Sequence, residues 1–102
     1  MKEEKHPNVI WIFGDQHRGQ ALSCMGDPNL QTPNIDRLAE TGINFTRAVS
    51  GCPLCSPFRG SLLSGLYPHE CVPGHDCAMP DGITTVGDVL QDAGYSTAWS
   101  KS

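Results

Sequence analysis

The sequence predicts an α/β fold, because apolar runs typical of strands alternate with short helical patterns. Residues 8–13 form a continuous apolar, β-branched and aromatic run that ends at Gly14, which is typical of a strand buried on both faces of a parallel sheet. Residues 32–42 then carry cap-type residues and a proline in front, apolar residues at helical spacing and a terminal glycine. This pattern predicts a short helix after the first strand.

The second half of the chain continues the alternation of strands and helices. Residues 43–49 alternate apolar and polar side chains, although the alternation is not complete. They predict a strand that leads into a loop at 50–54. A helix is expected to begin around Ser56 or Pro57 and to end near Gly65. The remaining predicted elements are a long loop at residues 67–82, a helix at 86–92 capped by Thr84 and Thr85 and ended by Gly94, and a strand that begins at 95–99.

Length and composition limit the chain to one small domain. At 102 residues it is too short for two domains, and its hydrophobic content of 38% lies below the roughly 45–50% of ordinary globular chains. The core that it can bury alone is therefore thin, which indicates an incomplete fold. The formal net charge is −4 and the seven Lys and Arg residues are scattered, so the basic surface of a nucleic-acid-binding protein is missing.

The N-terminal residues do not have the pattern of an export signal. They carry charges of both signs, and the apolar stretch at 9–13 is too short for the core of a signal peptide or for a membrane span. We therefore expect a cytoplasmic protein with no membrane segment. The five cysteines, an odd number, are then better explained as reactive, metal-binding or buried thiols than as a disulfide framework.

The segment at residues 52–65, with the sequence CPLCSPFRGSLLSG, carries the most chemical information. Cys55 is predicted just before a helix, whose dipole stabilises an anion, and Arg59 one turn later adds a positive charge. Backbone N–H groups in that first turn can also bind a sulfate or phosphate oxygen, so the place suits an anionic substrate. Cys52 and Cys55 also have the spacing of half a zinc site or of a redox pair, so a non-enzymatic thiol or zinc-binding module stays open.

These residues resemble the sulfatases, in which the pattern Cys-x-Pro-x-Arg marks a cysteine that is oxidised after synthesis to formylglycine. Cys55, Pro57 and Arg59 stand in the matching places. The resemblance covers most of the chain, through further matching stretches at residues 32–38, 42–45, 62–65 and 67–69. It implies an alkaline-phosphatase-like α/β sandwich, a mostly parallel sheet with helices on both faces. Residues 1–102 would form only the N-terminal part of that catalytic domain, with no second domain.

The opening segment resembles the first strand of the family, which delivers an acidic pair to a divalent cation. Asp15 matches the first acid, whereas Gln16 stands where many members have a second Asp. The resemblance implies a cation bound by Asp15, Gln16 and the modified Cys55, with Ca2+ as the first choice and Mn2+ or Mg2+ as alternatives. Related phosphonate monoester hydrolases also have Asp-Gln here. A phosphonate or phosphate ester hydrolase of the same superfamily is therefore the near alternative.

The resemblance also implies a mechanism and partners. In the family the aldehyde is hydrated to a geminal diol, and one hydroxyl attacks sulfur while the metal and cationic side chains hold the sulfate oxygens. The second hydroxyl lets the sulfated intermediate collapse back to the aldehyde. Arg59 would orient the diol and offset its charge. The implied partners are a sulfate-ester small molecule or sugar and the maturation enzyme that generates formylglycine.

Other polar and thiol residues receive simpler interpretations. Cys24, Cys52 and Cys77 are interpreted as buried or incidental thiols, and His17, Arg18, His69 and His75 as solvated loop side chains. Lys101 stands one place too early to match the catalytic lysine of the family, and the family's later metal ligands have no counterpart in the sequence. We therefore expect the chain alone to be inactive and to self-associate through unpaired strand edges.

Overall fold

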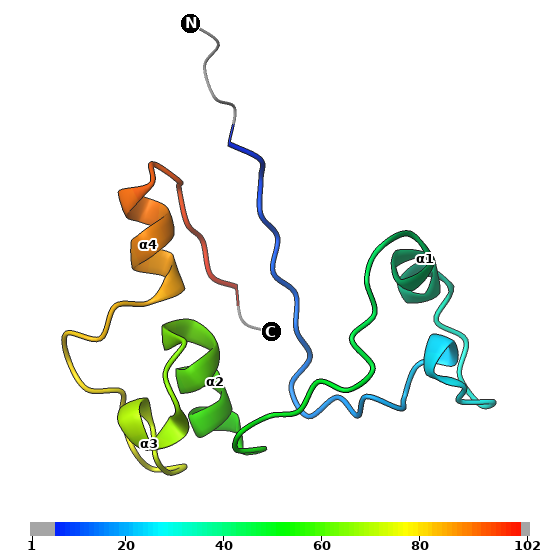
Figure 1. The fold of residues 1–102 in the computed structure, drawn as a ribbon, viewed down its shortest axis with the longest axis horizontal. Helices are drawn as coiled ribbons and strands as arrows, with labels where there is room; N and C mark the ends of the chain where they lie inside the picture. Colours follow the sequence, from blue (N-terminus) through cyan, green and yellow to red (C-terminus); the bar gives the residue numbers. More distant parts are fainter. Residues whose placement is uncertain (1–5, 101–102) are drawn as a thin grey trace, which may run out of the picture. The chain divides into compact units, whose positions relative to one another are not determined.

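The computed structural model describes residues 6–100, so Lys101 lies outside the described residues. Contacts divide the chain into two compact units, Met1–Asn44 and Phe45–Ser102. The first unit contains η1 (Ser23–Met25) and α1 (Pro33–Thr41); the second contains α2 (Cys55–Ser64), α3 (Pro68–Cys71) and α4 (Val86–Asp92) (Figure 1). None of the described helices is long and apolar enough to cross a bilayer.

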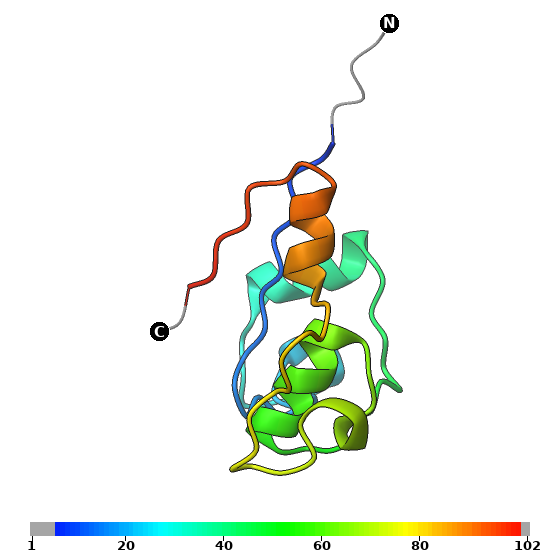
Figure 2. The ribbon, with the colours of Figure 1, turned by 90° about the vertical axis from the view of Figure 1, so that its left-hand side faces the viewer.

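The first predicted strand, at residues 8–13, runs as an extended segment but is not paired (Figures 1 and 2). The exposed fractions of its side chains are 61% for Val9, 83% for Ile10 and 86% for Ile12, so the expected burial on both faces is absent. β-branched residues favour an extended backbone by themselves, whereas burial needs neighbouring strands and covering helices. Residues 43–49 and 95–99 also lie outside any paired strand. Within residues 6–100 the sheet of the α/β fold therefore stays a prediction.

Helix α1 confirms the helix predicted from residues 32–42. Thr32 is its N-cap and Pro33 its first residue, where a missing N–H costs no helical hydrogen bond. The helix ends at Gly42, whose N–H donates to the Leu38 carbonyl at 2.8 Å. These local signals were sufficient to predict both ends of the helix.

A network of side chains ties η1, which the sequence did not predict, to the first turn of α1. The Asp36 carboxylate accepts hydrogen bonds from Ser23 Oγ at 2.5 Å, from Thr32 Oγ1 at 3.0 Å and from the Cys24 N–H at 3.0 Å. The Thr32 N–H donates to Ser23 Oγ at 2.9 Å, which closes the network. The hydrogen bond from Ser23, followed by those from Thr32 and Cys24, lowers the pKa of Asp36.

The second unit has a small core where α2 meets α3, which lie side by side in Figures 1 and 2. Its buried side chains are those of Pro57 in α2, Cys71 at the end of α3 and Val72, with exposed fractions of 1% for Cys71 and 4% for Val72. A Cβ atom built on Gly60 would lie 2.6 Å from Val72 Cγ2, so the two segments touch where α2 has no side chain. The prediction of one continuous loop at residues 67–82 is wrong at α3. This helix has a single turn, which is too short to produce a helical pattern in the sequence.

Helix α4 confirms the predicted helix at 86–92, but only Thr85 caps it. The Thr85 N–H donates to Asp88 Oδ2 at 2.7 Å, and Thr85 Oγ1 accepts from the Asp88 N–H at 3.4 Å. This reciprocal pair is a capping box, which satisfies two N–H groups that the helix itself leaves unpaired. The Thr85 hydroxyl also donates to the Asp88 carboxylate, and this bond is the main reason why the pKa of Asp88 is lowered.

We predict that the junction between η1 and α1 loosens in acid through Asp36. Its folded-state pKa lies below the unfolded value of about 3.9, so the stabilisation is complete above about pH 4 and is lost as pH falls through the lower, folded pKa. The NMR chemical shifts of the Ser23 and Cys24 amides, followed from pH 6 to pH 2, will measure the loss of these hydrogen bonds. Asp36→Asn should abolish the dependence and Asp27→Asn should keep it. A transition above pH 4 in the unaltered chain would contradict the assignment.

Candidate functional site

Helix α2 begins at Cys55, slightly earlier than the predicted start at Ser56 or Pro57. Leu54 is the N-cap with an extended backbone, and its carbonyl accepts the first helical hydrogen bond from the Phe58 N–H at 2.9 Å. Pro57 fits in this turn because N–H groups of the first turn have no helical partner. Cys55 is therefore the first helical residue, at the positive end of the helix dipole.

Cys55 and Arg59 lie on the same face of α2. Four residues at about 100° each place Arg59 about 40° from Cys55 around the helix axis, which makes the two side chains neighbours. Pro57 and Gly60, the buried residues of α2, lie about 200° and 140° from Cys55 by the same geometry. The packed face thus points away from Cys55, which is exposed, and Arg59 is half-buried. The packing of α2 on α3 therefore uses the side of the helix that is turned away from Cys55.

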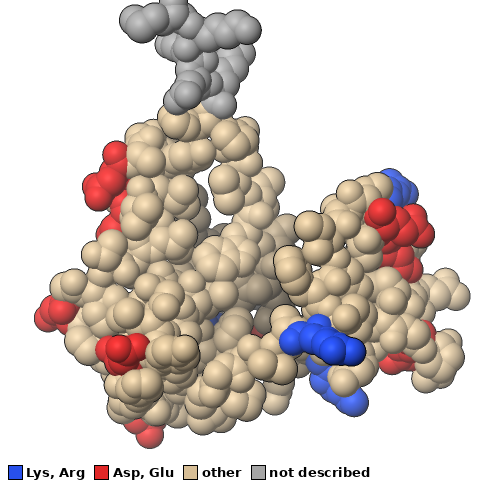
Figure 3. All heavy atoms as spheres, viewed as in Figure 1, with Lys and Arg blue, Asp and Glu red and all other residues tan. Residues whose placement is uncertain are grey.

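The charge of the second unit makes the position of Arg59 significant. Between residues 45 and 100 the sequence has five Asp or Glu residues but only two basic residues, Arg47 and Arg59. In Figure 3, red acidic groups appear at several places on the left of the view, where α3 and α4 lie in Figure 1. An anionic ligand would be repelled by much of this surface. The first turn of α2 offsets that repulsion, because it combines an arginine with the helix N-terminus.

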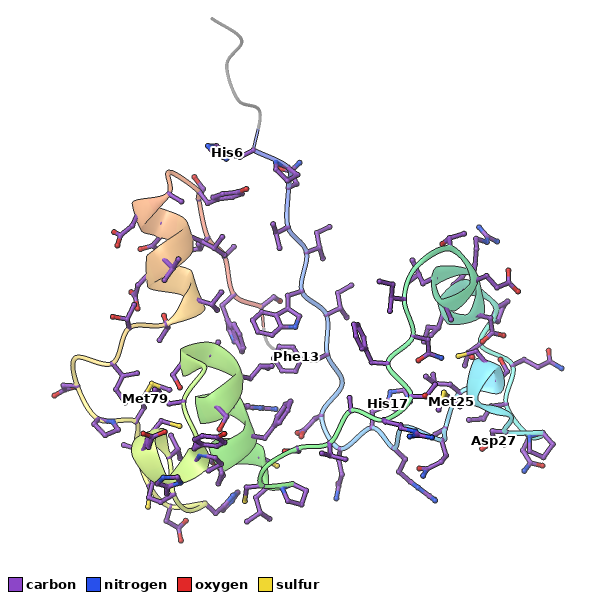
Figure 4. The ribbon with its side chains drawn as sticks, viewed as in Figure 1. His6, Phe13, His17, Met25, Asp27 and Met79 are labelled. Carbon is purple, nitrogen blue, oxygen red and sulfur yellow. The ribbon has the colours of Figure 1, made fainter. Side chains whose placement is uncertain are left out.

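Asp15 and Gln16 form a tight turn directly after the extended segment. The Gln16 N–H donates to Asp15 Oδ1 at 3.0 Å, so this carboxylate oxygen is held against the following amide. Gln16 has a φ of +30°, and a left-handed backbone costs residues other than glycine roughly 1 kcal/mol or more. His17, labelled in Figure 4, contacts the Ala21 carbonyl through Nε2 at 3.1 Å. A Cβ atom on Gly14 would lie 2.9 Å from His17 Cβ, so the turn also requires glycine there.

The four predicted site residues fall into two pairs. Cys55 and Arg59 share one helix face in the second unit, and Asp15 and Gln16 share one turn in the first unit. The joint site of all four that the resemblance implies stays a prediction. Sequence analysis missed the residues that determine which side of α2 is packed, above all Gly60. A glycine inside a helical pattern was the available signal, because such glycines often mark a close approach of another segment.

The described residues do not complete a metal site. Among residues 6–100, no group of three or more His, Cys, Asp or Glu side chains is arranged to hold a metal ion. Asp15 and Gln16 offer hard oxygen donors of the kind that Ca2+, Mn2+ and Mg2+ prefer, but such cations need about six. This donor pair alone does not fit a bound cation. Cys52 and Cys55 would likewise supply two of the four ligands that structural zinc takes.

No disulfide joins the five cysteines, and their environments differ. Cys55 and Cys77 are exposed, Cys52 is half-buried and Cys71 is buried. Cys24 is exposed too; partial desolvation, followed by the negative charge of Asp36, raises the pKa of its thiol. Of the three cysteines interpreted as buried or incidental thiols, Cys24 and Cys77 are thus exposed and Cys52 is half-buried, and the interpretation stays a prediction.

The histidine and arginine side chains outside α2 lie at the surface. His17, Arg18, His69 and His75 are all exposed, as the sequence interpretation expects. His69 stacks on the ring of Tyr67, with ring centroids 5.9 Å apart and planes at 11°. This contact holds His69 at the start of α3 and gives it no partner from the α2 face.

Comparison with known proteins settles the family. The sequence model of the Sulfatase family matches residues 7–102, which is nearly the whole chain. The chain belongs to the sulfatase family. Membership supports the predicted α/β fold class, although no solved structure matches the chain.

Curated sulfatases align with most of the chain. An ulvan-active sulfatase of Formosa agariphila is 43% identical over 103 residues, covering 97% of this chain and 20% of the relative. An endo-4-O-sulfatase of Bacteroides thetaiotaomicron is 37% identical, covering 96% and 23%. Human arylsulfatase A is 38% identical, covering 89% and 19%. The chain therefore spans about a fifth of the length of these sulfatases.

We predict that Cys71 is protected from alkylation in the folded chain, whereas Cys55 and Cys77 react. Because Cys71 is buried beneath α2, its reaction requires local opening and should be at least about tenfold slower. Peptide mass spectrometry after timed treatment with iodoacetamide will give the three rates. In urea the rates should converge. Equal rates in the native chain would mean that α2 and α3 are not packed together in solution.

Proposed function

We propose that this chain carries the nucleophile of a sulfuric ester hydrolase and forms the N-terminal part of its catalytic domain. Cys55, converted to formylglycine, is the proposed nucleophile, and its hydrated aldehyde supplies the hydroxyl that attacks a sulfate ester. The observation that carries the proposal is the geometry of α2. An exposed Cys55 and a half-buried Arg59 share one face of the helix, while the opposite face is packed.

The surroundings of Cys55 support an anionic substrate. The first turn of α2 contributes backbone N–H groups and the positive end of a ten-residue helix, which favour the oxygens of a sulfate group. Arg59 adds a guanidinium within one turn, and its planar fork suits two sulfate oxygens or the negatively charged nucleophile. An unmodified serine hydroxyl at this position would lack the second hydroxyl that lets the sulfated intermediate collapse back to the aldehyde. The proposed substrate is a sulfate-ester small molecule or sugar, in keeping with the similarity to an ulvan-active sulfatase.

Asp15 and Gln16 are the proposed contribution of this chain to a divalent-cation site. The turn at 14–17 holds the Asp15 carboxylate at the end of the extended segment, and Gln16 can offer its amide oxygen. Ca2+ is the first choice because it accepts neutral oxygen ligands and variable geometry, with Mn2+ or Mg2+ as alternatives. The cation would neutralise charge on the sulfate oxygens. The modified Cys55 would be a further ligand and the rest would come from outside the described residues, so we assign no catalytic step to the cation.

We predict that Cys55 alone is converted to formylglycine when the full-length protein is produced with a formylglycine-generating enzyme. Only Cys55 has proline and arginine two and four residues later. Cys71 is a built-in control, because Pro73 stands at the same offset but His75 replaces the arginine. Peptide mass spectrometry of all five cysteines will decide. Conversion at Cys52 or Cys71, or an unmodified Cys55 in active protein, would refute the assignment.

We predict that Asp15→Asn weakens divalent-cation binding and lowers the turnover of sulfate esters in the full-length protein. The substitution replaces a charged oxygen ligand by a neutral one of the same shape, for which a loss of about 10–100-fold in affinity is typical. Titration calorimetry with Ca2+ and Mn2+ measures binding independently of activity. Asp27→Asn, in the same unit, is the matched control. Cation affinity that is equal in both variants would remove Asp15 from the site.

We predict that the 102-residue chain alone has no measurable sulfatase activity, even with Cys55 converted. Two oxygen donors are far short of the six or so that a divalent cation needs, and the exposed segment at 8–13 favours association over a stable monomer. The test supplies Ca2+ or Mn2+ to the purified chain and assays an aryl sulfate beside a phosphonate monoester. Light scattering reports the oligomeric state. Multiple turnovers by a monodisperse monomer on either substrate would overturn this prediction.

A further inference from the structure

We propose that residues 67–72, named here the brace, set the direction of Cys55 and Arg59, and that Gly60 is the positioning residue where the brace contacts α2. The inference rests on the proposed function, since it concerns the orientation of the proposed nucleophile. It adds residues that do not touch the substrate themselves. They act through the rotation and placement of α2.

The first contact lies in the middle of α2. A Cβ atom on Gly60 would come within 2.6 Å of Val72 Cγ2, 2.9 Å of Val72 Cβ and 3.1 Å of Cys71 Sγ. Side chains do not tolerate the two shorter distances, so the present arrangement requires glycine at this position. Gly60 is buried, and so are both residues that it meets. The depth of this contact fixes which side of α2 faces inward.

The second contact lies before α2 begins. A Cβ atom on Gly51 would lie 3.8 Å from Pro68 Cδ and 3.9 Å from its Cγ, so the loop that enters α2 runs beside the start of α3. The two contacts lie on either side of Cys55 and Arg59 along the chain. The brace therefore holds α2 at its middle and the loop at its entrance, which restricts both rotation and tilt of the helix.

Hydrogen bonds make the brace itself rigid. The Tyr67 N–H donates to Glu70 Oε2 at 3.2 Å, and the Glu70 N–H donates to the Tyr67 carbonyl at 2.9 Å. The Cys71 thiol donates to the same carbonyl at 3.4 Å. These bonds close the turn of α3 on itself, so Val72 is presented to Gly60 from a fixed support.

The connection from α2 to the brace is also short and fixed. The Ser64 hydroxyl donates to the Gly60 carbonyl at 2.6 Å and accepts from the Leu66 N–H at 3.2 Å. Gly65 between them has a φ of +73°, which glycine adopts without strain. A displacement at Gly60 would therefore be transmitted to Cys55 through the helix and could not be absorbed by a flexible loop.

The test is a set of glycine and valine variants in the full-length protein. Gly60→Ala adds one methyl group at the contact. Val72→Ala in the same protein removes Val72 Cγ2, which this methyl would meet at 2.6 Å, but keeps Val72 Cβ at 2.9 Å, so it relieves the overlap only in part. Gly87→Ala is the matched control, because a Cβ atom there meets only Thr85 Oγ1, at 3.5 Å. For each variant, mass spectrometry gives the formylglycine content, and kcat and KM for an aryl sulfate are measured per modified site.

We expect Gly60→Ala to lower kcat by about tenfold or more with KM within about twofold, because a displaced nucleophile affects the chemical step more than binding. The double variant Gly60→Ala with Val72→Ala should have a kcat at least about threefold higher than Gly60→Ala alone. Gly87→Ala should leave kcat unchanged. Unchanged kcat in Gly60→Ala, or no recovery in the double variant, would overturn the proposal. If Gly60→Ala does not fold, Val72→Ala alone decides, since it loosens the contact without adding atoms. A normal kcat in that variant would overturn the proposal.

Failure of the proposed function gives a different result. If the unaltered protein has neither formylglycine nor turnover, the proposed function is wrong, and the brace is judged by amide exchange in the full-length protein. The Phe58 N–H, which bonds to the Leu54 carbonyl in the first turn of α2, should exchange faster in Gly60→Ala and not in Gly87→Ala. Equal exchange in both variants would show that the brace does not hold α2.

Discussion

The close approach of Gly60 to Cys71 and Val72 is the contact on which the second unit depends. Cys71 and Val72 are, together with Pro57, the buried apolar side chains among the described residues, so this contact accounts for much of the core. A small core leaves little redundancy, because few other contacts can compensate for the loss of one. The brace occupies one side of α2, and Cys55 with Arg59 lies on the other side.

The elements that the sequence predicted are those specified by near neighbours. Pro33 and Gly42 bound α1, and Thr85 with Asp88 caps α4, all through interactions that span at most four residues. The shared face of Cys55 and Arg59 follows from the helical repeat in the same way. Helix α3 was not predictable, because a single turn has no periodicity and is stabilised by packing on α2.

Features that depend on distant partners could not be derived from the sequence in this way. A strand such as residues 8–13 is marked by its composition, yet its burial depends on strands and helices elsewhere in the fold. The turn at residues 14–17, which follows this segment, was also not predictable from composition. The need for glycine at Gly14 and the left-handed backbone of Gln16 arise from the path of the chain at His17, which composition does not report. The joint site expected from the Asp15 pair and the Cys55 pair would also depend on distant parts of the chain, so it stays a prediction.

The exposed apolar segment at 8–13 has a consequence for synthesis on the ribosome. Residues 8–13 leave the exit tunnel before α2 and α4, yet the helices close through local hydrogen bonds while the segment still lacks partners. During that interval Ile10 and Ile12 face water and resemble the sites to which chaperones bind. In the predicted sheet, the nascent chain would need such protection until this segment pairs, and non-local pairing of this kind is slow. The helix that carries Cys55 can form well before that pairing is complete.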